Sequence, residues 1–463
     1  MKKLIIPNGT VTAKADPRLN HDMAKKMWKN FTLLGSELEM EDGLPLTFTI
    51  GDCSVPTLEA SSEYALSITE TGAAVVGKDY GGLMRGYLVL LMKMMFNGEY
   101  CELTPVAEQS QYLLKNRMLH ICVFPDNTLY EIKKIIRLAG LCQYTHIIIE
   151  FWGTLQYDCM KELAWQNHSF TKEEARELIC DAKCLGMEPI PMFNHLGHAT
   201  ASRSCHGKHV VLEQNPRLQH LFTPDGWAWD IHSPKVLELM KQVRNELYEL
   251  FGNGTYMHIG CDEAFYYSHS DQERKQLPDY LAKLTNEVVA EGRRPMVWMD
   301  MLLEKGKYPS HTENGRRTHY VTTCAPDEVE PLQKSLHPAT VMVDWQYWVY
   351  EAPVPTLLSL KDNGYDAMGA PWFEADNYKA YVDTIVDNNM FGIMMTTWHT
   401  LKEKMFSILG CAKQCGATTF PWSNTAGKYR EEAATMLRRI SFEGNDYGSS
   451  GWTRYDMVDH FMK

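Results

Sequence analysis

The neighbouring acids Asp262 and Glu263 offer the clearest chemistry in the sequence. They end the run His258-Ile259-Gly260-Cys261-Asp262-Glu263, so two carboxyl groups stand side by side where an apolar segment stops. Carboxyl groups in such a place are candidates for general acid and base catalysis. Consecutive side chains of a regular strand point to opposite faces, so both reach one pocket only if the chain leaves strand geometry there. Gly260 lowers the conformational cost of that departure.

Tryptophans follow three later apolar runs, each beside a polar residue. Pyranose rings stack their C–H faces on aromatic rings, and carboxylates take charge-assisted hydrogen bonds from sugar hydroxyls, so the pattern indicates a carbohydrate site. Two plainer interpretations stay open: each tryptophan packs in the core, or Asp262 caps a helix while Glu263 faces solvent. The tryptophans and their polar neighbours are Trp298 with Asp300, Trp345 with Asp344, and Trp398 with His399.

These residues must be positioned by the elements in which they stand, and from Arg117 onward the sequence alternates apolar strands with helices. That alternation is the signature of a parallel sheet with crossover helices, and eight such units predict a (β/α)8 barrel, an α/β fold. The carboxyl ends of the eight strands then form one face, where barrel enzymes hold their active sites. Segment 318–323 also has the pattern of a strand, either a ninth piece or an inserted hairpin. The eight predicted strands are 118–122, 147–151, 188–193, 256–260, 296–300, 341–345, 366–371 and 392–398.

The first 110 residues have a different pattern, with short alternating runs and an apolar segment at 82–95 that predicts a helix after a Gly-Gly turn. We therefore predict a small α/β domain over residues 1–110 and the barrel over 111–463. Within the barrel, Thr171 and Glu174 have the spacing of a capping box at the start of a helix.

Composition excludes several classes of protein. The 463 residues carry 46 Lys and Arg against 58 Asp and Glu, a net charge of −12, and no basic cluster that would meet nucleic-acid phosphates or an anionic membrane surface. The most apolar stretch, 83–96, is interrupted by Arg85 and Lys93, so no segment has the roughly 18 uncharged residues of a membrane span. We expect a soluble protein.

The twelve cysteines are dilute in a chain of this length, which favours reduced thiols over a disulfide framework. The closest pairs, Cys180 with Cys184 and Cys411 with Cys415, have the spacing of helix neighbours and not that of a metal-binding CxxC. The initial apolar run at residues 4–6 is too short for a secretion signal. These features predict a cytoplasmic location.

The run ending in Asp262-Glu263 resembles the H-x-G-G-D-E signature of glycoside hydrolase family 20, the β-N-acetylhexosaminidases, with Cys261 in place of the second glycine. The segment His195-Leu196-Gly197-His198 is similar to that family's P-G-H loop after the third strand, and Arg117 stands where the family has an arginine at the first strand. A small α/β domain before the barrel is a further likeness. The HIGCDE form most resembles the intracellular hexosaminidase D branch.

The resemblance implies a substrate-assisted retaining mechanism, in which the 2-acetamido oxygen of the substrate attacks the anomeric carbon and forms an oxazolinium. Glu263 would protonate the leaving oxygen and then activate water, and Asp262 would accept the acetamide N–H. The implied reaction is exo-hydrolysis of terminal β-linked GlcNAc or GalNAc without a cofactor. The expected partner is a glycan or glycoside with a terminal N-acetylhexosamine, and the sequence leaves a homo-oligomer open.

The resemblance also implies supporting residues. His198 would sit behind the acid, with a purely structural hydrogen bond as the alternative, and Arg117 would hold sugar hydroxyls, with an ordinary ion pair at the barrel rim as the alternative. Asn194 stands where the family usually has an aspartate, and Thr400 where it often has a glutamate, which suggests altered selectivity at O4 or O6. The remaining predicted sugar contacts are Trp298, Trp345, Trp398, Glu150, Asp300, Asp376 and Tyr378.

Two rival functions remain open. A metal-dependent hydrolase on the same barrel would use His195, His198, His258 and Asp262 as ligands, although the spacing of the first two suits no single helical face. A non-catalytic sugar-binding protein would keep the tryptophans but has no need of the intact acid pair.

Overall fold

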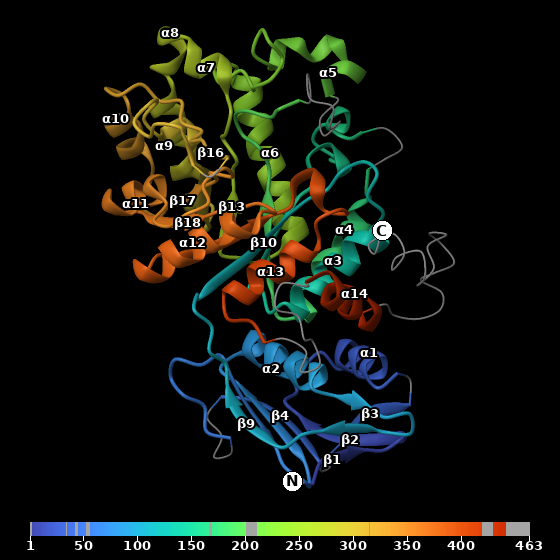
Figure 1. Cartoon of the computed structure of the whole chain (residues 1–463). Helices are drawn as coiled ribbons and strands as arrows, with labels where there is room; N and C mark the ends of the chain where they lie inside the picture. The colour runs from blue at the N-terminus through green and yellow to red at the C-terminus, as the bar shows by residue number, and fades with distance from the viewer. Residues whose placement is uncertain are drawn as a thin grey trace.

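Eight parallel strands close into a barrel in the computed structural model, which describes residues 2–33, 35–41, 45–51, 56–165, 169–200, 211–313, 315–418 and 429–440 (Figure 1). The last strand pairs with the first, which confirms the predicted (β/α)8 barrel. Each of the eight predicted segments overlaps a strand, and the strands stop one or two residues before the predicted ends, except the first. The strands are β10 (Asn116–Cys122), β11 (His146–Glu150), β12 (Glu188–Met192), β13 (Tyr256–His258), β14 (Arg294–Trp298), β17 (Val341–Asp344), β18 (Asp366–Gly369) and β19 (Gly392–Thr396).

Helices surround the barrel and follow its strands. The predicted capping box is present at the start of α4, where Thr171 accepts from the Glu174 amide and the Glu174 carboxylate accepts from the Thr171 amide. The longer helices are α3 (Leu129–Leu141), α4 (Lys172–Cys184), α6 (Pro234–Phe251), α9 (Leu277–Ala290), α10 (Val329–Ser335), α11 (Pro355–Asp362), α12 (Ala375–Asp387), α13 (Phe406–Gln414) and α14 (Tyr429–Arg439). Shorter helical turns are α5 (Val211–Gln214), α7 (Phe265–His269), α8 (Asp271–Arg274), η1 (Trp152–Thr154), η2 (Lys161–Leu163), η3 (Pro216–Leu221), η4 (Asp300–Leu302) and η5 (Trp398–Thr400).

The N-terminal part forms a separate layered unit below the barrel (Figure 1). Its main sheet has the strand order β3-β2-β4-β6-β5-β9. Helix α2 (Tyr80–Met92) is buried on almost every side because it lies between this sheet and the barrel helix α3. The other elements are β1 (Leu4–Ile6), β2 (Gly9–Ala15), α1 (His21–Phe31), β3 (Ser36–Met40), β4 (Leu46–Ile50), β5 (Tyr64–Ile68), β6 (Ala73–Gly77), β7 (Met95–Phe96), β8 (Cys101–Leu103) and β9 (Val106–Gln109).

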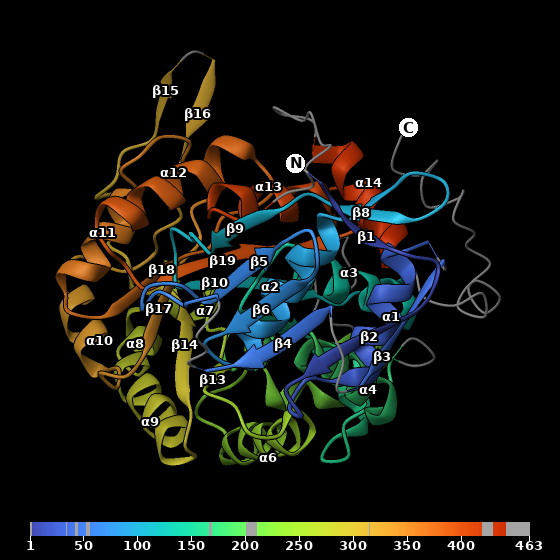
Figure 2. The same cartoon turned by 90° about the horizontal axis from the view of Figure 1, so that it is seen from below.

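This unit covers the amino-terminal ends of the barrel strands. Arg85 of α2 donates to the carbonyl of Gly186, two residues before β12, at 3.2 Å, and the hydroxyl of Tyr80 donates to the carbonyl of Cys184 at 2.7 Å. Seen from below, the N-terminal sheet lies across the base of the barrel (Figure 2). The carboxyl ends of the strands, where the candidate acids stand, are at the opposite face.

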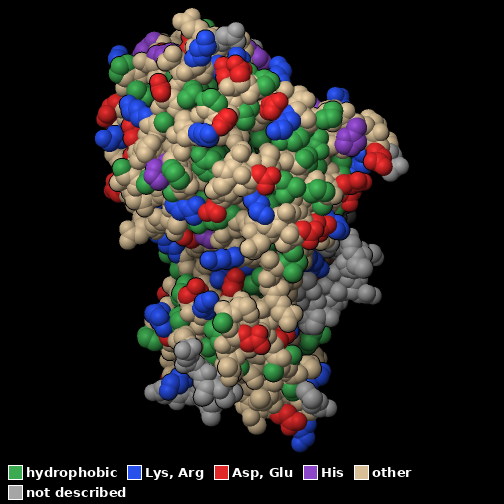
Figure 3. All heavy atoms as spheres, turned by 90° about the vertical axis from the view of Figure 1, so that its left-hand side faces the viewer, with side chains coloured by type: hydrophobic (Ala, Val, Ile, Leu, Met, Phe, Trp, Pro, Cys, Tyr) green, Lys and Arg blue, Asp and Glu red, His purple; other side chains and the backbone are tan. Residues whose placement is uncertain are grey.

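A small antiparallel hairpin, β15 (His311–Glu313) with β16 (Arg316–Thr318), is inserted between β14 and α10. Of the predicted strand 318–323, only its first residue belongs to β16, so this segment adds no ninth strand to the barrel. On the face in Figure 3, basic and acidic side chains are interspersed. In the described part of the chain no helix is both long and apolar enough to cross a membrane.

Candidate active site

The backbone turns sharply after β13, as the placement of both acids in one pocket requires. The backbone φ values of Gly260, Cys261 and Glu263 are 68°, 75° and 48°, a region that residues other than glycine seldom adopt. A Cβ on Gly260 would lie 1.8 Å from the Asn194 Oδ1, so only glycine fits against the neighbouring loop. Strain of this kind persists where surrounding structure enforces it, and it is common at functional sites.

His198 holds the two acids together. Its Nε2 lies 3.3 Å from the Asp262 Oδ2 and 3.0 Å from the Glu263 Oε2. The loop that carries His198 packs directly on the loop of Asp262 and Glu263. The space between them is so small that a Cβ on Gly197 would lie 1.9 Å from the Asp262 carbonyl oxygen. Since one nitrogen faces both carboxylates, the two acids lie on the same side of the imidazole.

The two carboxylates differ in exposure. The Asp262 side chain is 6% exposed, and its Oδ1 is buried with no hydrogen-bond partner among the described residues. Such an atom loses its hydration without compensation until a donor reaches it. The Glu263 side chain is 30% exposed. Asp262 therefore offers a buried acceptor oxygen to an N–H or O–H group of a ligand, and Glu263 is accessible to the reacting atoms.

Asp300 supports the acid loop from beneath. Its Oδ2 accepts the Glu263 amide at 2.9 Å, and its Oδ1 accepts the Trp345 indole N–H at 3.2 Å. Burial, together with the negative charges of Asp262 and Glu263, raises the pKa of Asp300 well above its usual value. The expectation that Asp300 binds a sugar hydroxyl is wrong in this structure, because it is buried and both oxygens already accept.

Aromatic side chains from the last strands form one wall. The Trp398 indole donates to the Tyr347 hydroxyl at 2.6 Å, and the ring of Trp345 lies 5.2 Å from that of Tyr347. Trp298 is completely buried and packs 5.8 Å from Trp398, so it supports this wall from below. For Trp298 the core-packing interpretation is therefore the correct one, whereas Trp345 and Trp398 stay predicted sugar contacts. Sequence reasoning missed Tyr347, although its position two residues after Trp345 was a usable signal.

Two further tryptophans contact His198 and were also missed. Trp152 of η1 stacks on the imidazole at 5.6 Å with an interplanar angle of 21°. Trp227 lies 4.6 Å from the imidazole on another side and donates its indole N–H to the Glu263 carbonyl at 2.8 Å. Trp152 directly follows the predicted strand 147–151, so its position was a usable signal, whereas Trp227 follows no predicted strand.

Glu150 does not reach the sugar position. Its two oxygens lie 2.8 Å from the His120 Nε2 and 2.9 Å from the Asn194 Nδ2, and all three side chains are buried. The prediction that Glu150 binds a hydroxyl is therefore wrong. As the last residue of β11, Glu150 fixes the Asn194 loop, which in turn packs against Gly260.

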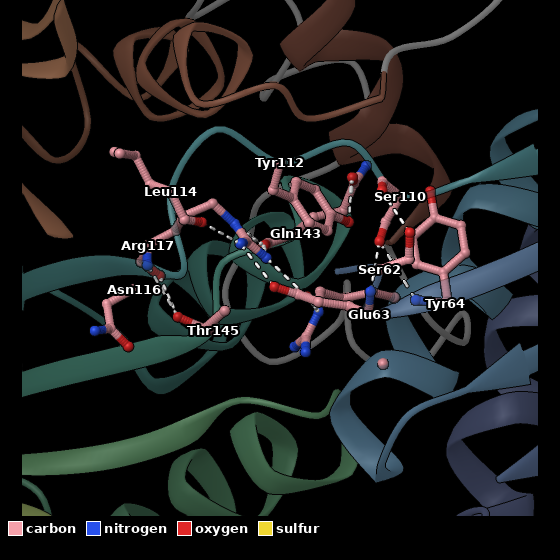
Figure 4. Close-up of polar contacts among 12 residues, drawn as sticks. Ser62, Glu63, Tyr64, Ser110, Tyr112, Leu114, Asn116, Arg117, Gln143 and Thr145 are labelled. Atoms are coloured by element: carbon pink, nitrogen blue, oxygen red, sulfur yellow. Dashed lines mark hydrogen bonds and ion pairs between the residues drawn. The ribbon is translucent and has the colours of Figure 1, made fainter. Parts of the chain in front are cut away.

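Arg117 lies at the other end of the barrel. It is the second residue of β10, and its guanidinium donates to Glu63 of the N-terminal unit at 2.9 and 3.0 Å (Figure 4). It also donates to the carbonyls of Leu114 and Gln143. The predicted sugar contact is wrong, because the amino-terminal end of a barrel strand cannot reach a site at the carboxyl ends. The ion-pair alternative is the correct one.

Asp376 and Tyr378 are likewise not part of the acid cluster. Tyr378 is buried in the hydrophobic core, so the prediction of a sugar contact there is wrong. Asp376 pairs with Arg316 of β16 and lines a pocket of about 510 Å³ under the hairpin. None of the residues around the acid pair lines that pocket, so the structure does not bring Asp376 to the site.

The predicted set of four metal ligands is not assembled. In the described ranges, the group suited to a metal is His198, Asp262 and Glu263, whose ligand atoms lie within 4.8 Å of one another. The Nδ1 of His195 faces the Phe193 carbonyl at 2.7 Å, and His258 accepts the Gly260 amide. Burial lowers the pKa of both buried histidines, to about 3 for His195, so both are neutral.

Comparison with known proteins agrees with this geometry. The sequence profile of the glycosyl hydrolase family 20 catalytic domain matches residues 149–322, which include the loops of His198 and of the acid pair. The chain is similar to hexosaminidase D of Bos taurus, with 26% identity over 217 residues, or 44% of this chain. That match spans 57% of the length of the bovine protein.

Solved structures share the fold across nearly the whole chain. A chitobiase from Flavobacterium johnsoniae has a TM-score of 0.69 at 13% identity, covering 95% of this chain and 70% of that one. A β-N-acetylhexosaminidase from Bacteroides fragilis has a TM-score of 0.66 at 15% identity, covering 97% and 96%. At such identities the likeness concerns the fold.

Proposed function

The chain belongs to glycosyl hydrolase family 20, and from this premise we propose that it is an exo-acting β-N-acetylhexosaminidase. The proposed substrate is a glycan or glycoside that ends in β-linked GlcNAc or GalNAc. One observation carries the proposal: a buried, unpaired oxygen of Asp262 lies beside an accessible Glu263, with both acids held by His198. An acetamide N–H supplies the donor that the Asp262 oxygen lacks.

The arrangement favours a nucleophile that comes from the substrate. A retaining enzyme that uses its own carboxylate needs it on the face of the sugar opposite the leaving group. Asp262 cannot occupy that face because it shares the His198 nitrogen with the acid Glu263. Glu150 and Asp300 are buried and bound on both oxygens. The 2-acetamido oxygen can approach from the opposite face, which gives the oxazolinium route.

Each residue then has a distinct task. Glu263 donates a proton to the glycosidic oxygen and later takes one from water. Asp262 orients the acetamide and stabilises the positive charge that develops on it in the transition state. The wall of Trp345, Tyr347 and Trp398 excludes water from the charged intermediate.

Two substitutions test the assignment. Glu263→Gln should lower kcat on an unactivated disaccharide by about 10²- to 10⁴-fold, the usual cost of losing a general acid and base. Asp262→Asn should lower kcat while the sugar still binds, because the contribution of Asp262 belongs mainly to the transition state. A parental rate in Glu263→Gln would contradict the proposal, and so would an Asp262→Asn variant that changes only KM.

A metal-dependent hydrolase is the second candidate, favoured by the spacing of ligand atoms among His198, Asp262 and Glu263. Dialysis against a chelator separates the two candidates. The hexosaminidase proposal expects full activity afterwards, whereas activity that is lost and then restored by a divalent cation would support the second candidate.

We further propose a reducing, cytoplasmic location, because none of the ten described cysteines forms a disulfide. Cys180 and Cys184 lie one turn apart on α4 with 3.8 Å between their sulfurs, close enough to oxidise in a disulfide-forming compartment. Thiol titration of protein isolated from its host should give equal counts before and after reduction. A higher count after reduction would contradict this proposal.

A further inference from the structure

The pocket under the hairpin β15–β16 has no role in the account above. Its volume of about 510 Å³ is within the range of sites that hold small molecules. It is built by the connections that follow three neighbouring barrel strands, β14, β17 and β18. Because strand-to-helix connections lie at the carboxyl end of a barrel, the pocket is at the same end as the acid pair.

One face of the hairpin forms the roof of this pocket. Side chains of a strand alternate between two faces, and residues opposite each other on paired strands share a face. His311 is opposite Thr318 and Glu313 is opposite Arg316, and all four line the pocket. The pair between them faces the other way and does not line it. The hairpin, which projects beside α12 (Figure 2), therefore presents one polar face to the pocket.

Arg316 joins the hairpin to the two other connections. Its guanidinium lies 3.8 Å from the centre of the Tyr350 ring, on the connection after β17. It also donates to the carboxylates of Glu374 and Asp376, at the start of α12. These contacts fix the walls of the pocket relative to one another. A site that is already formed loses little conformational entropy when a ligand binds.

Several polar groups of the pocket lack a protein partner within the described ranges. The hydroxyls of Tyr320 and Tyr350 form no hydrogen bond there, and Glu313 and Glu351 form no ion pair there. Tyrosine hydroxyls donate and accept, carboxylates accept, and tyrosine rings offer flat apolar faces. A saccharide matches all of these groups, because its hydroxyls suit the polar atoms and its C–H faces suit the rings.

The charge of the pocket is negative. The carboxylates of Glu313, Glu351 and Asp376 line it together with the guanidinium of Arg316, which is already paired with Asp376. Carboxylates accept hydrogen bonds from sugar hydroxyls, whereas they repel sulfate, phosphate and other carboxylate groups. The charge therefore favours a neutral saccharide over an anionic one.

We propose that this pocket is a second carbohydrate-binding site, which holds a neutral oligosaccharide without cleaving it. None of His198, Asp262 and Glu263 lines the pocket, so it has no acid pair to act on a bound sugar. The inference goes beyond the proposed function, because binding here does not depend on hydrolysis. The connection after β17 carries both Tyr350 and Tyr347 of the catalytic wall, so a glycan held in the pocket stays near the acid pair, and its local concentration there rises.

The test measures binding of the β-linked trimer of N-acetylglucosamine while a thiazoline analogue of the oxazolinium fills the catalytic pocket. Titration followed by NMR of the trimer should show that it still binds the parental protein. Tyr350→Ala should weaken this binding about 5- to 20-fold, the range expected for the loss of a stacked ring, and Tyr350→Phe should keep most of it. Tyr100→Ala is the matched control, since Tyr100 is a half-buried tyrosine of the N-terminal unit, and it should keep the parental Kd.

The outcomes separate the second site from the catalytic one. Trimer binding that disappears when the thiazoline analogue is added would overturn the second site, and so would an unchanged Kd in Tyr350→Ala. A sulfated trimer that binds more tightly than the neutral one would overturn the proposed class of ligand. A parental protein that neither binds the analogue nor cleaves an N-acetylhexosaminide would contradict only the proposed function, and trimer binding that depends on Tyr350 would still support the pocket.

Discussion

Replacement of Arg117 by methionine should destabilise the protein and leave its catalysis intact. Arg117 is buried and makes hydrogen bonds to Glu63, to the Leu114 carbonyl and to the Gln143 carbonyl, and its guanidinium lies 3.6 Å from the Tyr112 ring centre. Burial alone would raise the pKa of Glu63, but Arg85 and Arg117 together hold it below its usual value. Methionine fills the volume and removes the charge.

The expected loss follows from these contacts. Removing one partner of a buried ion pair costs about 3 to 5 kcal/mol, because the other charge stays buried. Arg85 remains beside Glu63 in the variant and offsets part of this loss, so we expect about 3 kcal/mol. The double variant Glu63→Gln, Arg117→Met should lose less unfolding free energy than the sum of the two single variants. Once one partner of the ion pair has been replaced, the second substitution removes a side chain that has already lost that partner.

Urea unfolding measures the loss as a lower midpoint at unchanged slope, and kinetics on the folded variant measure the site. KM and kcat on an N-acetylhexosaminide should stay within about twofold of the parental values, well under the tenfold that 1.4 kcal/mol would give. A variant of parental stability with a strongly raised KM would refute this reasoning and restore Arg117 to the sugar site.

Two further predictions concern the acid loop and a buried acid. Gly260→Ala should abolish activity, because the added Cβ would lie 1.8 Å from the Asn194 Oδ1. The control is Gly364→Ala, also at positive φ but with no atom within 4 Å of the added Cβ, which should cost only about 1 kcal/mol of unfolding free energy and keep activity. Comparable activity in the two variants would contradict the close packing at Gly260. Burial raises the pKa of Asp344 to about 6. Between pH 4 and pH 6 the folded protein therefore holds a proton on Asp344 that the unfolded chain has released. The contribution of Asp344 to the free energy of unfolding falls as pH rises through this range and is absent above pH 6. Relative to Asp344→Asn, which cannot titrate, the parent should lose about 2 to 3 kcal/mol of unfolding free energy between pH 4 and pH 7, as urea unfolding at both pH values would measure; a constant difference would contradict the raised pKa.

The barrel could be predicted from sequence because its strands are long apolar runs between amphipathic helices. The predicted ends were too late because residues such as Trp398 and Asp300 belong to helical turns that follow the strands. Apolar character continues into these turns, so hydrophobicity alone does not mark where strand pairing ends.

The candidate site was partly predictable. Asp262, Glu263 and His198 could be found because they follow apolar strands, and the structure brings them together. Arg117 was misplaced because its role was taken from the family resemblance, although it precedes the predicted strand 118–122 and so belongs to the amino-terminal end of the barrel. Trp227 was missed because it reaches the acid from a loop between η3 and α6, a contact set by tertiary packing.

Buried polar partners were equally invisible to sequence reasoning. Glu150 and Asp300 have the composition of sugar ligands, yet each is occupied by groups from other strands. Whether a carboxylate binds substrate or holds a loop depends on which donors the fold brings to it, and these donors are far away in the sequence.

The most direct test of the central claim measures hydrolysis of three aryl β-glycosides by the purified protein: the N-acetylglucosaminide, the N-acetylgalactosaminide and the plain glucoside that lacks the acetamide. If the acetamide bound at Asp262 supplies the nucleophile, the protein will cleave one or both acetamido sugars and leave the glucoside intact. Cleavage of the glucoside at a comparable rate would show that the nucleophile belongs to the protein, and it would contradict the substrate-assisted mechanism.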